Sequence, residues 1–179
     1  MDRRAVEKAP DPAVLSAVLS AREERWIRRM ALAKDSASLL SATLCVPLPV
    51  RTSPEGKRLL RKTLQELEKK LKQAGFQPAA AEYMDGADGL AAFLPCGGEA
   101  EDLKRFCVRE EEALPAGRLL DLDVTARGGR PIGRAELGLP PRRCFLCGRP
   151  AAECVSGQRH TQEGVLAYVR ELLGKEIQE

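Results

Sequence analysis

The sequence predicts an α+β fold in which packed helices accompany a mixed, partly antiparallel sheet and a Cys/His-rich C-terminal loop segment. Segments with a helical apolar period are interspersed with short apolar runs, without a strict strand–helix–strand alternation. Glycine-containing turns separate several of these runs, which is typical of antiparallel hairpins. The chain has 179 residues, of which 44% are hydrophobic. We therefore expect a single domain over 1–179 with a real core.

Four segments are expected to be helices. Asp11 can cap the first, with Pro12 at its first position, where the missing N–H costs nothing. Gly75 is expected to end the second helix, and Thr161 to cap the last. The expected helices span 12–34, 54–74, 101–112 and 162–173. The polar residues 1–11 at the start of the chain are expected to be flexible.

Short apolar runs are expected to be strands. The dipeptide Asp85-Gly86 between two of them is a hairpin signal, and Gly128-Gly129 marks a second hairpin. The residues from Pro47 to Pro54 include three prolines and are expected to form a rigid loop. The expected strands span 38–46, 77–84, 89–94, 118–125 and 130–132.

Composition favours a cytoplasmic protein. No apolar run approaches the roughly 20 residues that cross a bilayer, and the N-terminus lacks the basic-then-apolar pattern of a secretion signal. Six cysteines without such a signal indicate a reducing compartment. The net charge of +3 does not by itself indicate a nucleic-acid partner.

Two aspartates form the sharpest catalytic candidate. Asp121 and Asp123 alternate with apolar residues in an expected strand, so both carboxylates project from the same face. Adjacent carboxylates repel unless a cation lies between them, and Mg²⁺ prefers a few carboxylates together with phosphate oxygens. The pattern therefore predicts a magnesium site that binds a phosphate-bearing substrate. The alternative is an amphipathic edge strand with two solvated aspartates.

A second cluster predicts a structural metal site. Cys144, Cys147, Cys154 and His160 lie close together in a loop-rich segment, 139–160. Zn²⁺ favours four nitrogen or sulfur ligands, and a Cys₃His set leaves no position for water. The alternative is a set of reduced cysteines in a packed loop, with His160 serving substrate or capping the last helix.

The residues from Gly117 to Thr161 resemble the apo-citrate lyase phosphoribosyl-dephospho-CoA transferase family, also called holo-citrate-lyase synthase. The resemblance rests on an ordered string of short motifs across this region. Its members are Gly117-Arg118-Leu119-Leu120-Asp121-Leu122-Asp123-Val124, Arg134, Leu137-Gly138-Leu139-Pro140-Pro141-Arg142-Arg143-Cys144, Cys147, Ala151, Cys154 and Arg159-His160-Thr161. The stretches Ala21-Arg22-Glu23-Glu24-Arg25 and Val50-Arg51-Thr52-Ser53-Pro54 agree more loosely.

The resemblance implies a nucleotidyltransferase. Its donor would be 2'-(5''-triphosphoribosyl)-3'-dephospho-CoA, its acceptor a serine of the citrate lyase acyl-carrier subunit, and its leaving group pyrophosphate. Asp121 and Asp123 would hold Mg²⁺ on the donor, and one of them could accept the serine proton. Arginines would bind the phosphate oxygens. The candidates are Arg118, Arg134, Arg142 and Arg143, with Arg22 and Arg51 as weaker ones.

Two other functions remain open at this point. One is a non-enzymatic, zinc-stabilised adaptor that binds an acidic carrier protein through its arginines; it would tolerate Asp121→Asn and Asp123→Asn. The other is the same transfer onto a different carrier, such as that of a malonate decarboxylase, which a carrier-swap assay would reveal.

Overall fold

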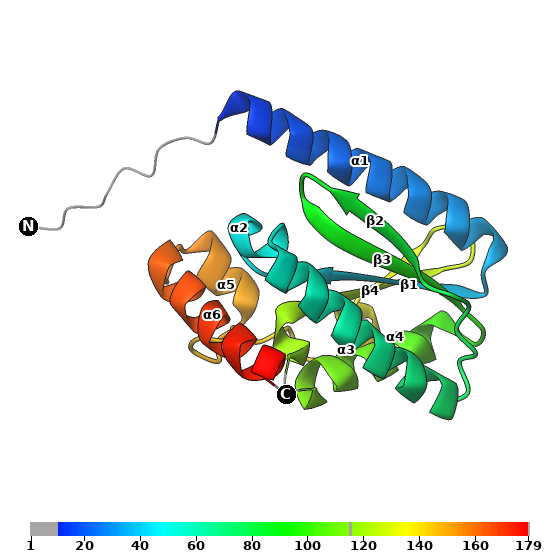
Figure 1. Ribbon diagram of the computed structural model, residues 1–179. Helices are drawn as coiled ribbons and strands as arrows, with labels where there is room; N and C mark the ends of the chain where they lie inside the picture. Colours follow the sequence, from blue (N-terminus) through cyan, green and yellow to red (C-terminus); the bar gives the residue numbers. More distant parts are fainter. Residues whose placement is uncertain (1–10, 115, 179) are drawn as a thin grey trace, which may run out of the picture.

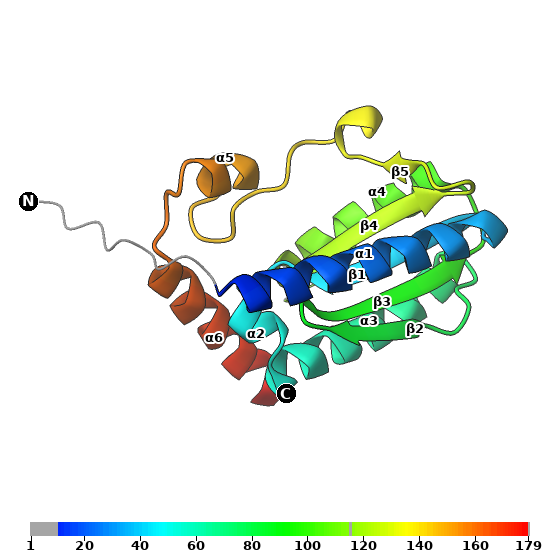
Figure 2. The ribbon, with the colours of Figure 1, turned by 90° about the horizontal axis from the view of Figure 1, so that it is seen from above.

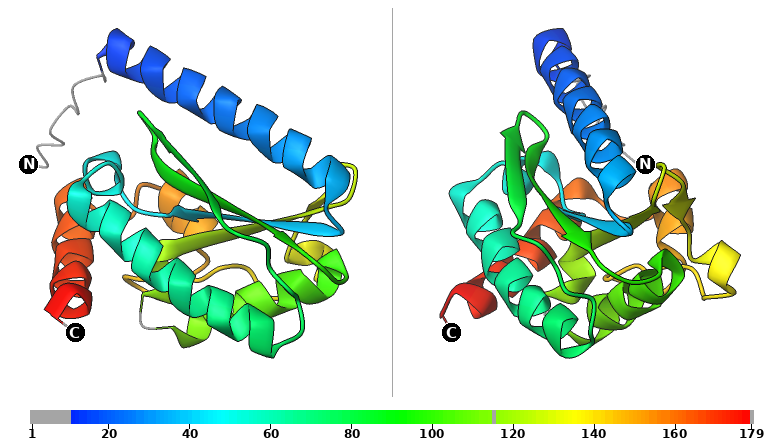
Figure 3. Two further views of the ribbon diagram at one scale, coloured as in Figure 1. Left: turned by 45° about the vertical axis from the view of Figure 1, so that its right-hand side comes forward. Right: turned by 90° about the vertical axis from the view of Figure 1, so that its right-hand side faces the viewer.

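The computed structural model describes residues 11–114 and 116–178, apart from the side chains of 175–178. A five-stranded antiparallel sheet separates two helical layers (Figure 1). The first helix lies on one face of the sheet, and α3 (Pro54–Gln73) and α4 (Ala100–Ala113) cover the other (Figure 3). The fold class expected from the sequence is confirmed. Residues 1–10 of the segment expected to be flexible lie outside the described residues.

The helices and strands alternate irregularly along the chain. The helices are α1 (Pro12–Asp35), α2 (Leu48–Arg51), α3 (Pro54–Gln73), α4 (Ala100–Ala113), α5 (Ala151–Ser156) and α6 (Gln162–Gln178). The strands are β1 (Ser38–Leu44), β2 (Glu82–Gly86), β3 (Gly89–Cys96), β4 (Leu120–Ala126) and β5 (Pro131–Ile132). Caps predicted from the sequence are present: Asp11 accepts a hydrogen bond from the Ala13 N–H, and Thr161 accepts one from the Gly164 N–H.

The strand order is β2-β3-β1-β4-β5, so β1 and β4 are neighbours at the centre of the sheet. Every strand pair is antiparallel. Because side chains alternate between the faces of a strand, the register of β1 against β4 decides which residues share a face. It places Ser41 opposite Asp123 and Thr43 opposite Asp121.

The main hydrophobic core lies on the sheet face covered by α3, α4 and α6. Leu122 of β4 and Leu40 of β1 are fully buried there, together with Leu67 of α3 and Val169 of α6. A smaller cluster on the opposite face joins the C-terminal end of α1 to the sheet. Its buried members are Ala33, Leu39, Ala91 and Phe93. The buried apolar packing between α1 and the sheet is therefore concentrated at one end of that helix.

The N-terminal half of α1 is much less covered. Leu15 and Leu19 are 47% and 54% exposed, and Trp26 further along is 55% exposed. Seen from above, α1 lies over the sheet between β3 and β4 (Figure 2). None of the helices in the described part of the chain is long and apolar enough to cross a membrane.

The structure corrects several expected boundaries. The proline-rich segment 47–54 contains the short helix α2, because a proline is tolerated in the first turn of a helix. A second short helix, α5, forms within the segment expected to be irregular. β2 begins at Glu82 rather than at residue 77, since Gln77 has a positive φ of 46° and Pro78 has no N–H to donate.

Candidate active site and metal centre

Asp121 and Asp123 occupy the face of β4 that is turned toward α1. Leu120, Leu122 and Val124 alternate with them and belong to the main core on the opposite face. The apolar residues fix the strand in register, so both carboxylates are forced to the same side, as the sequence predicted. They are partly exposed, because the space between α1 and the sheet is open to solvent.

A cleft of about 330 Å³ lies between α1 and the sheet and contains both aspartates. We call it the aspartate cleft. Its lining residues are Arg22, Arg25, Trp26 and Arg29 from α1, Ser41 and Thr43 from β1, Ala91 and Phe93 from β3, and Asp121 and Asp123 from β4. The cleft therefore combines a carboxylate pair on its floor with arginines along its roof.

The carboxylate of Asp123 is held in an unfavourable environment for its charge. Its pKa is raised, first because surrounding protein atoms desolvate the carboxylate and second because Asp121 is also negative. The side chain is still 56% exposed, since solvent reaches it through the cleft. Arg29 offsets part of the cost, with its Nη1 3.8 Å from Asp123 Oδ2. A bound cation would relieve the remaining repulsion.

The hydroxyl oxygen of Ser41 and Nε of Arg29 are buried in the aspartate cleft without a hydrogen-bond partner among the described residues. A buried polar group that lacks a partner costs free energy, and such groups in native structures usually bind a protein group, an ordered water molecule or a ligand. Both atoms belong to residues beside Asp123, since Ser41 pairs with it across the strands and Arg29 forms its ion pair. They are suited to bind ligand oxygen atoms.

The arginines of α1 differ in whether their charges are paired with a carboxylate. Arg25 forms an ion pair with Asp88 in the β2–β3 turn, where Asp88 is only 3% exposed. The pKa of Arg25 is lowered, chiefly by desolvation on burial. Arg22 has neither a hydrogen bond nor an ion pair among the described residues. Arg25 thus ties α1 to the sheet, while Arg22 keeps an uncompensated charge at the cleft.

A second cleft, of about 300 Å³, contains the arginines predicted from the C-terminal half. We call it the arginine cleft. Its lining residues are Glu111, Glu112, Arg118, Arg134, Pro140, Arg142 and Arg143. The structure therefore divides the predicted phosphate-binding residues between two places, with Arg22 in the aspartate cleft and four arginines in this one.

Arg134 and Arg51 are engaged by the protein itself. Arg134 forms an ion pair with Glu111, whose side chain is 5% exposed and whose other oxygen accepts a 3.0 Å hydrogen bond from the Leu122 N–H. The Arg51 guanidinium donates to the Val46 carbonyl at 3.1 Å and lines neither cleft. Both guanidinium groups therefore already have partners within the protein.

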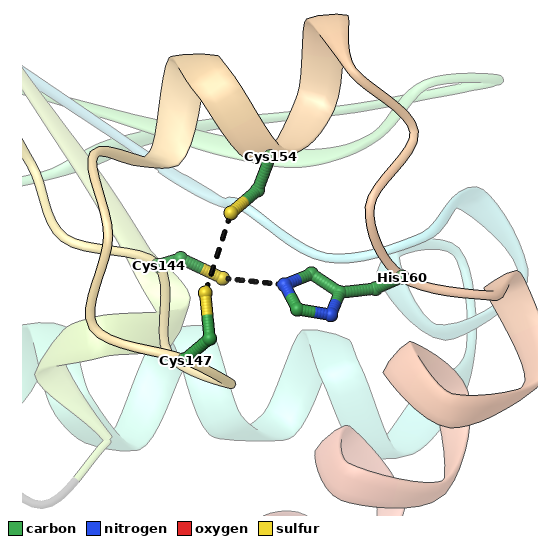
Figure 4. A group of neighbouring side chains, drawn as sticks. All are labelled: Cys144, Cys147, Cys154 and His160. Carbon is green, nitrogen blue, oxygen red and sulfur yellow. Dashed lines mark hydrogen bonds between the residues drawn. The ribbon is translucent and has the colours of Figure 1, made fainter.

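The four predicted metal ligands converge at one point (Figure 4). The Cys144–Gly148 loop turns back on itself, since the Gly148 N–H donates to the Cys144 carbonyl at 2.9 Å and Gly148 has a positive φ of 73°. Cys154 comes from α5, and His160 follows it before α6 begins. One ligand atom from each residue lies within 4.8 Å of the other three.

The chemistry of this cluster fits a metal ion such as zinc. Cys144 Sγ lies 3.4 Å from His160 Nε2, and Cys147 Sγ lies 3.4 Å from Cys154 Sγ. Ligands on a tetrahedral zinc at about 2.0–2.3 Å lie at similar mutual separations. The pKa of Cys147 is lowered to about 7, mainly by a backbone hydrogen bond from Arg149, so this thiol readily yields the thiolate that a metal binds. Burial raises the pKa of Cys154 to about 11.

The sequence alone does not mark Arg29 or Ser41 as site residues. Nothing in the sequence indicates that the helix carrying Arg29 lies over the face of β4. The pairing of Ser41 with Asp123 depends on the register of two strands that are far apart in the sequence. Ser41 does not stand out in the sequence, because Ser38 and Thr43 lie in the same strand.

Comparisons with known proteins identify the family of the chain. A sequence profile of the family "apo-citrate lyase phosphoribosyl-dephospho-CoA transferase" matches residues 13–176. The chain is 33% identical to the protein of that name from Citrobacter koseri over 157 residues, covering 87% of this chain and 86% of the relative. A probable member from Streptococcus pyogenes is 36% identical, with 89% and 84% covered, and one from Escherichia coli is 32% identical, with 87% and 86% covered.

Both clefts and the Cys/His cluster lie within the matched region. The matches extend over most of each chain, so they concern the whole fold rather than a short motif. The chain is an enzyme of the apo-citrate lyase phosphoribosyl-dephospho-CoA transferase family.

Proposed function

We propose that this enzyme transfers the phosphoribosyl-dephospho-CoA group from 2'-(5''-triphosphoribosyl)-3'-dephospho-CoA to a serine hydroxyl of the citrate lyase acyl-carrier subunit. Pyrophosphate is the leaving group. The proposal rests on family membership and on one observation: Asp121 and Asp123 lie side by side on the floor of a cleft whose roof carries arginines. We further propose that the reaction takes place in the cytoplasm.

Asp121 and Asp123 would hold Mg²⁺, and the bound ion would neutralise the negative charge that develops on the donor phosphates. In the reaction, the serine oxygen forms a bond to the α-phosphorus of the triphosphate, and the bond from that phosphorus to the oxygen bridging to the β-phosphate breaks. The electron pair leaves with pyrophosphate, and one of the two carboxylates accepts the serine proton.

The arginines and Ser41 supply positioning, which is the main contribution a protein makes to phosphoryl and nucleotidyl transfer. Arg22 and Arg29 project from α1 toward the space where the triphosphate would lie. The buried Ser41 hydroxyl can donate to a phosphate oxygen. Arg118, Arg134, Arg142 and Arg143 remain candidates for phosphate contacts in the neighbouring cleft, and Arg51 is the weakest candidate because it lines neither cleft.

We also propose that the Cys/His cluster binds zinc in a structural role. With four protein ligands it has no position left for water or substrate, so it contributes no chemistry to the transfer. Its contribution is to order the segment that carries Arg142 and Arg143, which immediately precede the first ligand, Cys144.

The decisive experiment measures the intact mass of the carrier. The full chain would be incubated with the apo acyl-carrier subunit of citrate lyase, the triphosphoribosyl donor and Mg²⁺, in parallel with an Asp121→Asn variant. We expect the carrier to gain the mass of the phosphoribosyl-dephospho-CoA group with the wild-type protein alone.

Two controls test the acceptor serine and the choice of carrier. A carrier whose acceptor serine is replaced by alanine should gain no mass, and the carrier of a malonate decarboxylase, offered in its place, tests carrier choice. If the wild-type protein binds the apo-carrier but never modifies it, the transferase proposal is wrong and an adaptor role replaces it.

A further inference from the structure

We propose that the arginine cleft is a second anion site, separate from the reaction centre, which binds a diphosphate group through Arg118 and Arg143. The inference rests on the proposed function for the identity of the ligand, but the site itself is argued from its contacts. Three properties support it: the balance of charges, the way the arginines are held, and the position of Asp121 and Asp123 in the other cleft.

The arginine cleft has positive charge that the protein does not neutralise. Among its four arginines, Arg134 is paired with both carboxylates of the cleft, Glu111 and Glu112, and Arg142 shares its charge with Asp121 at 3.3 Å. Arg118 and Arg143 form no ion pair with any described carboxylate. Two guanidinium groups without counter-ions therefore face one concave space of about 300 Å³.

Backbone carbonyls hold part of this array in place without cancelling its charge. The Arg118 guanidinium donates to the Cys144 carbonyl at 3.2 Å, and the Arg142 guanidinium donates to the Arg118 carbonyl at 3.0 Å. A neutral acceptor orients a guanidinium but leaves its full positive charge for another ligand. Arg143 has no side-chain partner among the described residues and is free to close on a ligand from solvent.

The number and chemistry of these groups fit a diphosphate. A guanidinium presents a planar fork of N–H donors that matches two oxygens of one phosphate, so two forks suit two linked phosphates. The concave shape favours a small, highly charged group over the flatter surface of a protein partner.

The reacting phosphate would lie elsewhere, because the acidic pair that would hold Mg²⁺ belongs to the aspartate cleft. Arg142 contacts Asp121 and lines the arginine cleft, so the two clefts meet at this pair. A donor long enough to occupy both could place its triphosphate over the aspartates and its CoA diphosphate among the arginines. The released pyrophosphate is the other possible source of a diphosphate.

The test is a binding measurement that needs no turnover. Isothermal titration calorimetry of the full chain, without Mg²⁺, would use pyrophosphate and dephospho-CoA as separate probes. Arg143→Gln removes one fork without disturbing any described contact, and Arg118→Gln removes the other. Arg58→Gln is the matched control, since Arg58 is an exposed arginine on α3 that pairs with Glu55 and lines neither cleft.

We expect Arg143→Gln to raise the Kd of at least one probe about tenfold, and Arg58→Gln to leave both unchanged. Weaker binding of dephospho-CoA alone would assign the cleft to the donor, and weaker binding of pyrophosphate alone would assign it to the product. If both arginine variants bind both probes as the wild type does, the inference is wrong. The inference is also wrong if the arginine variants weaken binding of the apo-carrier but leave the binding of both probes unchanged.

This outcome is distinguishable from failure of the proposed function. A wild-type protein that modifies the carrier, together with Arg118→Gln and Arg143→Gln variants that bind both probes as the wild type does, would contradict the second anion site alone. A wild-type protein that binds diphosphates through Arg143 yet never modifies the carrier would contradict the transferase proposal alone.

Discussion

The guanidinium of Arg142 donates a hydrogen bond of 3.3 Å to the carboxylate of Asp121 and thereby joins the two clefts. Arg142 is held there by two further bonds, to the carbonyls of Arg118 and Leu120. It comes from the segment that precedes the Cys/His cluster, whereas Asp121 comes from the centre of the sheet. The geometry of the acidic pair therefore depends on a segment that the sheet does not contain.

Replacing either carboxylate should abolish most turnover while preserving the fold. Asp121→Asn and Asp123→Asn keep the side-chain shape but remove a negative charge from the proposed Mg²⁺ site. We expect the rate of carrier modification to fall about a hundredfold or more. Asp85→Asn is the control, because Asp85 is an exposed aspartate that pairs with Lys57 outside the aspartate cleft. Full activity in both site variants would rule out the proposed magnesium role.

Asp123 should make the protein less stable as pH rises, when Mg²⁺ is absent. Its pKa is raised in the folded state, so the folded protein keeps this proton at pH values where the unfolded chain has lost it. Stability that is present at low pH is therefore lost between the ordinary aspartate pKa and the raised one. Urea denaturation across this window should show that Asp123→Asn removes part of the decline. An identical pH dependence in the variant would contradict the assignment.

Ser41 should matter for ligand binding rather than for stability. Its buried hydroxyl has no partner among the described residues, so Ser41→Ala should leave the free energy of unfolding unchanged or raise it slightly. We expect the KM for the donor to rise about fivefold, which corresponds to the loss of one hydrogen bond. Ser38→Ala on the same strand is the control, because Ser38 already donates to the Cys96 carbonyl on the other face. Steady-state kinetics of both variants would decide between a binding and a packing role for Ser41.

The Cys/His cluster should bind one zinc ion per chain. Elemental analysis of the purified protein would measure it, and Cys154→Ser should abolish it. Hydrogen exchange should then accelerate at the Cys144 and Gly148 amides, whose bonds close the ligand loop. Cys45→Ser is the matched control, since Cys45 is an exposed cysteine outside the cluster. Full zinc occupancy in Cys154→Ser would remove this residue from the ligand set.

The ion pair between Arg25 and Asp88 should be a major link between α1 and the β2–β3 hairpin. Arg25→Leu leaves a buried carboxylate uncompensated and should destabilise the protein by about 3–5 kcal/mol. Arg25→Leu combined with Asp88→Asn should recover part of this loss. A double-mutant cycle by chemical denaturation would measure the coupling, and purely additive effects would show that the pair is not a unit.

The elements with strong periodicity could be predicted from the sequence, and the short ones could not. The leucine period of α3 predicts both its existence and its buried face, and Gly75 does take a left-handed φ of 88° just after the helix ends. α2 and α5 are too short for a period to appear. The local hydrogen bonds that define them depend on packing against the rest of the chain.

The candidate site was predictable where its residues are close in sequence. The spacing of Asp121 and Asp123 fixes their common face, and the ligands from Cys144 to His160 come from one short segment. The roof of the aspartate cleft required the three-dimensional fold, because Arg29 reaches Asp123 only through the crossing of α1 over the sheet. Likewise, no sequence pattern reveals that Arg134 is paired with Glu111, or that Arg143 has no ion-pair partner in the described part of the chain.

The placement of α1 has a consequence for the order of events during synthesis. This helix leaves the ribosome before the whole sheet, and β4, which forms the floor of the aspartate cleft, follows only after β1, β2 and β3. In α1, Leu15, Leu19 and Trp26 are half exposed even in the folded protein. Until the central strands have paired, the helix has no sheet to pack against. Contacts that close such long loops form slowly. The aspartate cleft is thus among the last features to assemble in the nascent chain. Until it forms, α1 is exposed to chaperones and proteases.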